Sequence, residues 1–382
     1  MSAKINVSDP RVVMLEHSQA KVQLYSKYLS IYLNILGRTS FIKKIYLFDL
    51  MCGEGKYSND MNGSPVVAIE NIWNHYNANG QKVPDMEIIF NDNGMSEIQN
   101  GKFKIDRVRD ECTKLPIPSN VDVIYSKLDY SKIYQSVVDK INNLTQNERA
   151  LLFLDPYGYK DVKPEHLRLI LNGNKSEILL FMPISYLYRF AKKSMQEDFP
   201  GGVALQNFLN ELFLSNFPNY ESISEFIQKL KEQFLCYLGN ENYFVSTFEI
   251  ERDSHNIYCL FFFTASEKGF EKMLEVKWKI DQDRGEGFRF DRTVSLFSQI
   301  DNKNYREKLK KFIRDGSRKT NHEIYRFSLG NEFLPKHTNS ILKEWQMEDN
   351  SFEVTDESGN PMRKGAFYLS DKSKKAFFSF KK

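Results

Sequence analysis

The chain has 382 residues, of which 41% are hydrophobic and 14% aromatic, so it can build two domains or one elaborated domain with a substantial core. Its formal net charge is only +3, which excludes a uniformly polybasic nucleic-acid-coating protein. The charge is unevenly placed, because residues 303–382 hold 18 Lys and Arg against 11 Asp and Glu. A basic C-terminal module on a mildly acidic body indicates polyanion binding by that module.

The cysteines and the N-terminus carry no sign of a secreted or membrane protein. The four cysteines lie far apart and form no Cys-x-x-Cys pair, so a zinc knuckle or a disulfide framework is not expected. The N-terminus lacks the apolar core of a signal peptide, and no apolar run approaches transmembrane length. We expect a soluble protein of the reducing cytoplasm, with no membrane contact.

The first predicted helix begins near His17 and Lys21 and ends before Gly37, a plausible C-cap. Its apolar residues recur at helical spacing, namely Val22, Leu24, Tyr25, Tyr28, Leu29, Tyr32, Leu33 and Leu36. Two interpretations of His17 and Lys21 are open. They occupy an exposed first turn, or the helix lies across a cofactor site.

The stretch from Ile45 to Tyr57 is the one around which the chain is organised. A short apolar run ending in Asp49 predicts a buried parallel strand. Gly53 and Gly55 follow directly, and glycines at this point let the backbone turn tightly and approach a ligand closely. We interpret this stretch as the first strand and nucleotide-binding turn of a doubly wound α/β domain.

A helix and a second strand follow. Ser64 and Pro65 suit the N-cap and first position of an amphipathic helix. The second strand starts at Met86 and ends in Asn91-Asp92-Asn93. An acidic residue at this place in nucleoside-binding domains accepts ribose hydroxyls, which makes Asp92 the candidate. The alternative is that these polar residues simply form a turn.

The next two strands supply two more candidate carboxylates. Val121–Ser126 is predicted as the third strand, and Asp129 after it is placed to meet an adenine amino group or to sit in a solvated loop. The fourth strand, Ala150–Leu154, ends in Asp155-Pro156-Tyr157-Gly158-Tyr159. A carboxylate there can accept hydrogen bonds from an exocyclic amine, and an aromatic ring, Tyr157 or Tyr159, can stack on a base. The alternative is a loop turn with buried aromatic residues.

Further strands are expected at Glu177–Met182, Tyr243–Arg252 and Ile257–Thr264, with a helical insertion near 190–240. Because the strands alternate with helices, the pattern predicts an α/β fold with a doubly wound, mostly parallel sheet over residues 1–300. Gln299–Lys303 is a candidate linker.

Residues 304–382 are predicted to form a separate domain of three helices and a hairpin, Ser351–Val354 with Ala366–Leu369, which is a winged-helix layout. The candidate nucleic-acid contacts are Lys336, His337, Asn339 and Lys343 on the recognition helix and Arg363 and Lys364 on the wing. Winged helices also bind proteins, so a protein partner is the alternative.

Several of these motifs, in this order, resemble the three-Cys-motif partner protein (TcmP) family. They are His17-x-x-x-Lys21, Leu47-Phe48-Asp49-Leu50 with Gly53-Glu54-Gly55, Gly63-Ser64-Pro65, Leu154-Asp155-Pro156-Tyr157-Gly158-Tyr159, and Leu334-Pro335-Lys336-His337 through Arg363-Lys364-Gly365. The family in turn is similar to Rossmann-fold S-adenosylmethionine-dependent methyltransferases. The chain departs from the family's Gly-Pro-Gly turn at Glu54, and Tyr157-Gly158 breaks the Asp-Pro-Pro-aromatic pattern of amino-methyltransferases.

The resemblance implies roles for the candidate residues. Asp49, Cys52, Gly53 and Gly55 would line the methionine part of S-adenosylmethionine, Asp92 would hold its ribose, and Asp129 would lie near its adenine. Asp155, Pro156 and Tyr157 would face an exocyclic amine of DNA or RNA, with no metal required. The second hypothesis is a non-catalytic cofactor-binding scaffold that works with a partner protein, perhaps in defence against mobile elements; a third, a nuclease partner, lacks a carboxylate cluster at metal-binding spacing.

Overall fold

A computed structural model describes residues 12–79, 84–156, 158–159, 161–194, 203–213, 217–239, 242–253, 256–281, 287–289, 303–316, 318–370 and 375–381. The contacts divide the chain into two units, each with its own core. The first comprises residues 1–269 and 286–292, and the second comprises 270–285 and 293–382. Residues 270–285, which lie within the predicted first domain of residues 1–300, belong to the second unit. Most of the candidate linker, residues 299–302, lies outside the described residues.

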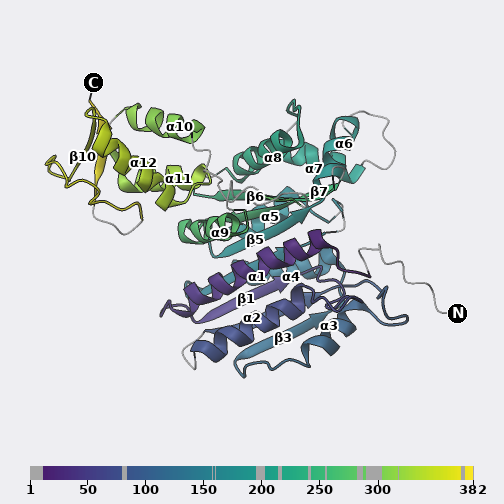
Figure 1. Cartoon of the computed structure of the whole chain (residues 1–382). Coiled ribbons are helices and arrows are strands. Elements are labelled where there is room, and N and C mark those ends of the chain that lie inside the picture. The colour runs from purple at the N-terminus through teal and green to yellow at the C-terminus, as the bar shows by residue number, and fades with distance from the viewer. Residues whose placement is uncertain are drawn as a thin grey trace. The chain divides into compact units, whose positions relative to one another are not determined.

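The first unit is built on a sheet whose described strands run in the order β3-β2-β1-β4-β5-β7-β6-β8 (Figure 1). Their bounds are β1 Lys44–Asp49, β2 Asp85–Asn91, β3 Val121–Ser126, β4 Glu148–Leu154, β5 Ser176–Met182, β6 Phe244–Asp253, β7 Asn256–Thr264 and β8 Gly287–Arg289. All pairings are parallel except those of β7, which is antiparallel to β5 and β6. The predicted α/β fold with a doubly wound, mostly parallel sheet is confirmed.

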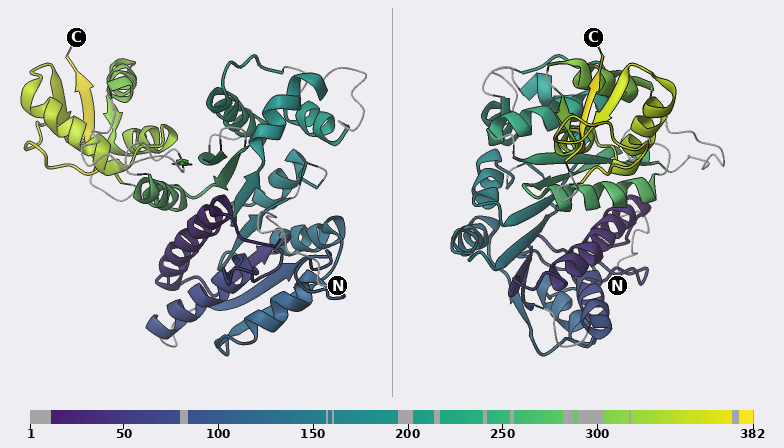
Figure 2. Two further views of the ribbon diagram at one scale, coloured as in Figure 1. Left: turned by 45° about the vertical axis from the view of Figure 1, so that its right-hand side comes forward. Right: turned by 90° about the vertical axis from the view of Figure 1, so that its left-hand side faces the viewer.

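The helices of the first unit cover both faces of the sheet (Figures 1 and 2). One layer holds α1 Glu16–Gly37, α2 Ser64–Asn79 and α3 Lys104–Cys112. The other face is packed by α4 Tyr130–Asn142, α5 Pro164–Leu171, α6 Ile184–Ser194, α7 Val203–Phe213 and α8 Ile223–Leu238. Helices on both faces explain why the central strands read as continuous apolar runs: β5, with all seven residues buried, shows no alternation.

The register fixes which residues reach the functional edge of the sheet. Asp49 of β1 pairs with Phe90 of β2 on one side and with Phe153 of β4 on the other. The turns that follow these three parallel strands therefore leave the sheet at the same edge, where ligands bind in folds of this class. The glycine turn follows β1, Asp92 follows β2, and Asp155 follows β4.

The second unit combines α9 Glu267–Ile280, from Phe270 onward, with α10 Lys303–Arg314, α11 Asn321–Gly330, α12 Pro335–Glu348 and a small antiparallel sheet. The sheet has the order β10-β11-β9, formed by Phe352–Thr355, Phe377–Phe380 and Lys319–Thr320. The prediction that Ala366–Leu369 forms the second hairpin strand is wrong, because the pairing strand is Phe377–Phe380. Phe378 of that strand is fully buried, and Phe367 and Leu369 of the earlier segment are buried without forming a strand.

Candidate functional site

The glycine turn and the Asp155 turn open into one cavity of about 300 Å³. Six segments of the first unit meet at the cavity, and its wall is formed by His17, Ser18, Lys21, Val22, Met51, Cys52, Gly53, Glu54, Tyr57, Ser64, Asp155, Pro156, Phe181, Pro183 and Tyr258.

The glycine turn needs its glycines for conformation and for space. Gly53 and Gly55 have φ values of 70° and 74°, a left-handed region that side chains disfavour. A Cβ on Gly55 would lie 3.0 Å from Cγ2 and 3.1 Å from Cα of Val108 in α3. The turn is closed by the amide of Gly63, which donates to the carbonyl of Gly55 at 2.6 Å.

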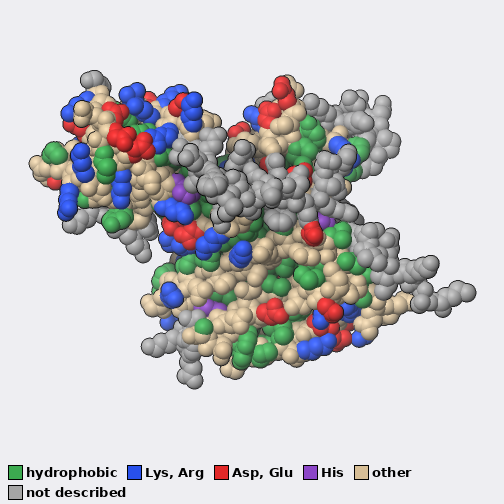
Figure 3. Space-filling view, viewed as in Figure 1, with side chains coloured by type: hydrophobic (Ala, Val, Ile, Leu, Met, Phe, Trp, Pro, Cys, Tyr) green, Lys and Arg blue, Asp and Glu red, His purple; other side chains and the backbone are tan. Residues whose placement is uncertain are grey.

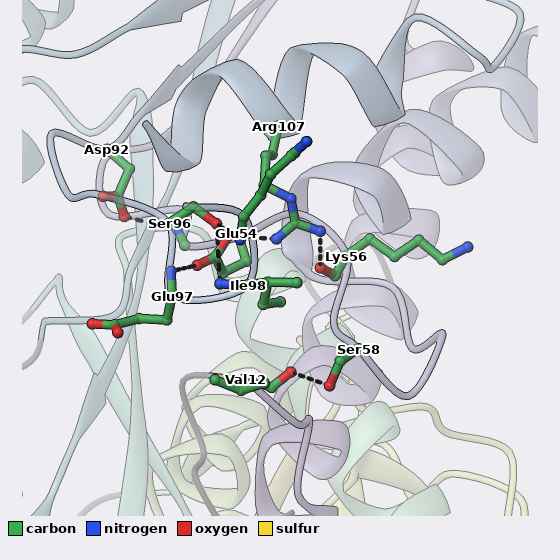
Figure 4. A network of polar contacts seen from close by, with 11 residues as sticks. Val12, Glu54, Lys56, Ser58, Asp92, Ser96, Glu97, Ile98 and Arg107 are labelled. Atoms are coloured by element: carbon green, nitrogen blue, oxygen red, sulfur yellow. Dashed lines mark hydrogen bonds and ion pairs between the residues drawn. The ribbon is translucent and has the colours of Figure 1, made fainter. Parts of the chain in front are cut away.

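Glu54 lies between the two glycines and ties the turn to the segment before α3 (Figure 4). Its carboxylate is 2% exposed and accepts hydrogen bonds from Ser96 Oγ at 2.9 Å, the amide of Glu97 at 2.7 Å and Arg107 Nη1 at 2.5 Å. Arg107 also donates to the carbonyl of Lys56 at 3.1 Å. The carboxylate that departs from the family's Gly-Pro-Gly pattern is therefore a fully paired structural group.

Asp49, at the end of β1, is fully buried and does not itself line the cavity. Ser64, which lines the cavity, donates to Oδ2 at 2.6 Å. Oδ1 is buried and has no hydrogen-bond partner among the described residues. Burial is the main cause that raises the pKa of Asp49 to about 7, and the charges of Asp155 and Asp92 raise it further. A buried carboxylate of this kind favours a cationic ligand nearby.

Asp155 projects into the cavity from the end of β4 and forms an ion pair with Lys21 of α1. The Lys21 side chain is 10% exposed and its ammonium lies 4.4 Å from the centre of the Phe181 ring, a cation–π contact. Asp155 is more open, at 26% exposure. Of the two interpretations of His17 and Lys21, the structure supports a helix that lies across the cavity.

An aromatic stack closes the cavity on the side of β5 and β7. The His17 ring stacks on Tyr258 with centroids 4.8 Å apart, and Tyr258 stacks on Phe181 at 5.2 Å. Neither Phe181 nor Tyr258 was predicted as a site residue. Phe181 lies in an apolar strand, and Tyr258 comes from a strand 209 residues after Asp49 in the chain, so only the sheet order could have found them.

Asp92 and Asp129 lie at the same edge but do not line this cavity. The Asp92 carboxylate accepts hydrogen bonds from the amide of Gly53 at 2.9 Å and from the amide of Gly94, two residues further on, at 2.8 Å. Through the bond to Gly53 the carboxylate holds the glycine turn against the end of β2, and its assignment to ribose stays a prediction. Asp129 is exposed and accepts a hydrogen bond from Asn93 at 2.7 Å, close to the solvated-loop interpretation.

Besides Asp155, three residues were predicted at the acceptor side of the site, and the structure places them differently. Pro156 lines the cavity beside Asp155. Tyr157 lies outside the described residues. The assignment of Tyr159 to base stacking is corrected, because its ring is buried between Tyr186 and Phe208 and its hydroxyl donates to the carbonyl of Pro183 at 2.5 Å.

The candidate nucleic-acid contacts lie in the second unit, where Lys and Arg side chains are numerous on the surface (Figure 3). Lys336, Arg363 and Lys364 are exposed, and Lys343 is half-buried with its ammonium 5.8 Å from the Tyr368 ring centre. His337 instead packs edge-on against Trp278 at 4.5 Å. Burial lowers the pKa of His337 to about 4, so a role as a phosphate-binding cation is corrected to a packing role.

Asn339 is half-buried on the same helix, and its Oδ1 has no hydrogen-bond partner among the described residues.

Over the described ranges, no group of three His, Cys, Asp or Glu side chains is arranged to hold a metal ion. Within the same ranges, no helix combines the length and apolarity that a membrane crossing requires.

No protein-family model and no curated protein matches this chain. Among solved structures it is similar to Trm1 from Pyrococcus horikoshii in complex with S-adenosyl-L-methionine, at 12% identity and a TM-score of 0.37. The match covers 67% of this chain but only 58% of the Trm1 chain. The resemblance to the three-Cys-motif partner protein family stays a prediction.

Two O-methyltransferases are also similar. The enzyme from Bacillus cereus, solved with SAH, has 10% identity and a TM-score of 0.33 over 63% of this chain and 80% of its own. TomG from Streptomyces achromogenes, solved with SAM, has 9% identity and a TM-score of 0.34 over 67% and 92%. The description of the fold rests on the strand order and register of this chain itself.

Proposed function

We propose that this chain is an S-adenosylmethionine-dependent methyltransferase acting on an exocyclic amine of a nucleic acid. The observation that carries the proposal is the shared cavity, which joins the glycine turn after β1 to Asp155 after β4. A cofactor bound at the first and an acceptor held at the second would meet inside one enclosed space. Holding two reactants in this way supplies most of the rate enhancement that a direct displacement requires.

The charges around the glycine turn fit the cofactor. S-adenosylmethionine carries an ammonium and a sulfonium, and Asp49, Asp92 and Asp155 are close enough for their charges to interact. The charge of Asp49, which lies behind Ser64 of the cavity wall, supports a cation at this end of the cavity. Cys52 and Gly53 would hold the methionine part of the cofactor. Ser64 lines the same cavity and is itself held in place by its hydrogen bond to Asp49.

Asp155 would act on the acceptor. The bound cofactor supplies an electrophilic methyl group. A carboxylate that accepts a hydrogen bond from an exocyclic amine orients the nitrogen lone pair and stabilises the positive charge that develops on that nitrogen. Pro156 would stiffen the turn that presents Asp155, because its ring fixes φ. Tyr157 remains the proposed stacking residue.

We further propose that the second unit is a winged-helix module that holds the polynucleotide. From α10 onward its order, α10-β9-α11-α12-β10-β11, is three helices with a three-stranded sheet, which supports this interpretation. The exposed cations Lys336, Arg363 and Lys364 would contact phosphates. Contacts of this kind give salt-dependent binding without specifying sequence.

A second candidate function is a non-catalytic cofactor-binding partner in a multi-protein system. The observation that favours it is the ion pair of Asp155 with Lys21, which leaves the carboxylate engaged within the protein. The two functions differ in one measurable respect. A scaffold would bind the cofactor without passing its methyl group to DNA or RNA.

The test is transfer of a labelled methyl group from S-adenosylmethionine to total cellular RNA and DNA, with the products digested to nucleosides. The wild type should label an amino-methylated nucleoside, and Asp155→Asn should lower the rate at least a hundredfold while retaining cofactor binding. The matched control is Asp110→Ala, which removes an exposed carboxylate paired with Lys102. Cofactor binding with no label in either nucleic acid would contradict the methyltransferase and favour the scaffold.

A further inference from the structure

Lys21 occupies the place beside Asp155 that an acceptor amine needs. It is a buried ammonium, 8% exposed as a residue, enclosed by the Asp155 carboxylate and the Phe181 ring within the cavity. Methyl transfer at this site, which is the function proposed above, requires Lys21 to give up Asp155. A buried ammonium without an anion costs several kcal/mol, so Lys21 must receive another anion when it moves.

The protein does not offer that anion from the described residues around the cavity. Glu54 is already bound by Arg107, Ser96 and the amide of Glu97. Asp92 accepts two backbone amides, and Asp49 lies behind Ser64, which donates to its Oδ2; neither carboxylate is in the cavity wall. The replacement anion must therefore arrive with a ligand.

S-adenosylmethionine carries such an anion at the end that the glycine turn would hold. Its methionine carboxylate would enter a cavity whose wall includes both Gly53 and Lys21. We propose that Lys21 exchanges Asp155 for the carboxylate of the cofactor, so that cofactor binding frees Asp155 for the acceptor. Two consequences follow: Lys21 is a determinant of cofactor affinity, and the cofactor binds before the acceptor.

The test compares the affinities of S-adenosylmethionine and decarboxylated S-adenosylmethionine for the full chain by isothermal titration calorimetry. Lys21→Met keeps an apolar stem near Phe181 and removes the charge. It should weaken binding of S-adenosylmethionine at least tenfold and leave the affinity for the decarboxylated analogue within about twofold. Lys21→Arg should restore part of the difference between the two ligands.

Asp155→Asn gives a readout that a merely structural role would not produce. Because Asn holds the Lys21 ammonium less strongly than a carboxylate does, this variant should bind S-adenosylmethionine several-fold more tightly than the wild type. The control is Lys44→Met, which breaks the ion pair with Glu87 at the opposite edge of the sheet and should change neither affinity.

The outcomes separate the inference from the proposed function. If the wild type binds neither ligand, both fail. If the wild type binds S-adenosylmethionine but Lys21→Met weakens the two ligands equally, or weakens neither, the exchange is wrong and the methyltransferase proposal stands. Weaker cofactor binding by Asp155→Asn would also overturn the exchange.

Discussion

The two turns that meet in the cavity are built on opposite principles. In the glycine turn the acidic groups are buried, and both Glu54 and Asp92 have their oxygens engaged by protein donors. In the Asp155 turn the carboxylate is a quarter exposed and has one partner, a lysine from another element. Carboxylates whose oxygens all accept hydrogen bonds from the protein stabilise the turn. A carboxylate with a single exchangeable partner can instead bind a ligand.

The largest effect expected from this comparison is on stability. Glu54→Ala removes three hydrogen bonds and leaves the Arg107 guanidinium, 12% exposed, without its carboxylate. Breaking a buried pair from one side costs about 3–5 kcal/mol. Asp155→Asn should cost about 1 kcal/mol or less, since the pair it alters is partly exposed. Urea denaturation measures both, and equal losses would contradict the contrast.

A second prediction concerns pH and compares Asp49 with Glu177 at the start of β5. Burial raises the pKa of each carboxyl to about 7, so the folded protein holds protons that the unfolded chain releases near its ordinary values. The stability is therefore fully present below about pH 4 and falls as pH rises through 7.

Each carboxyl should contribute about 2 kcal/mol of this loss between pH 5 and pH 7. Asp49→Asn should remove about half of the slope, and Glu177→Gln, which can keep its bonds to Tyr28 and Thr264, should remove the other half. Thermal unfolding across this pH range measures the slopes. A slope unchanged by both substitutions would show that these carboxyls are ionised in the folded state.

The third prediction compares two glycines, one from each turn. Gly55→Ala forces an L-residue to φ 74° and places its Cβ against Val108, and it should cost about 1–2 kcal/mol. A Cβ on Gly158, next to the Asp155 turn, would meet no atom within 4 Å, and Gly158→Ala should change stability by less than about 0.5 kcal/mol. Denaturation midpoints test the pair, and a larger loss at Gly158 would reverse the comparison.

The smallest effect is expected at the periphery of the same edge. Asp129→Ala removes an exposed hydrogen bond with Asn93 and should alter stability by less than about 0.5 kcal/mol. If this pair meets the adenosine part of the cofactor, its loss should weaken S-adenosylmethionine binding about threefold to tenfold. Calorimetry checks the affinity, and a stability loss above about 1 kcal/mol would assign Asp129 to the scaffold.

Local pattern was enough to predict most of the fold. The apolar runs at β1, β4 and β5 and the periodicity of α1 and α2 are signals that a few adjacent residues carry. The strand at Phe377–Phe380 was missed because Ala366–Leu369 has an equally suitable local pattern, and Phe367 and Leu369 are buried as Phe378 is; only the strand pairing distinguishes the two segments. The helix α5 Pro164–Leu171 was also missed, since eight residues give few helical repeats.

The candidate site was predictable where its residues follow strand ends and unpredictable where they come from elsewhere. Asp49, Gly53 and Asp155 could be found because parallel strands bring their carboxyl ends to one edge. The Glu54–Arg107 pair joins positions 53 residues apart, and nothing local to either residue indicates the other. Asp92 matched the expected position for a ribose ligand, yet its backbone bonds depend on how the turn closes in three dimensions.

The most direct test of the account is calorimetric titration of the wild-type chain with S-adenosylmethionine, with ATP as a nucleotide of opposite charge. The carboxylate of Asp155 in the cavity wall, with Asp49 and Asp92 close behind it, predicts one-to-one binding of the zwitterionic, sulfonium-bearing cofactor and no measurable binding of the triphosphate. Binding of ATP with equal affinity, or no heat from S-adenosylmethionine, would contradict a methyl-donor site between the glycine turn and Asp155.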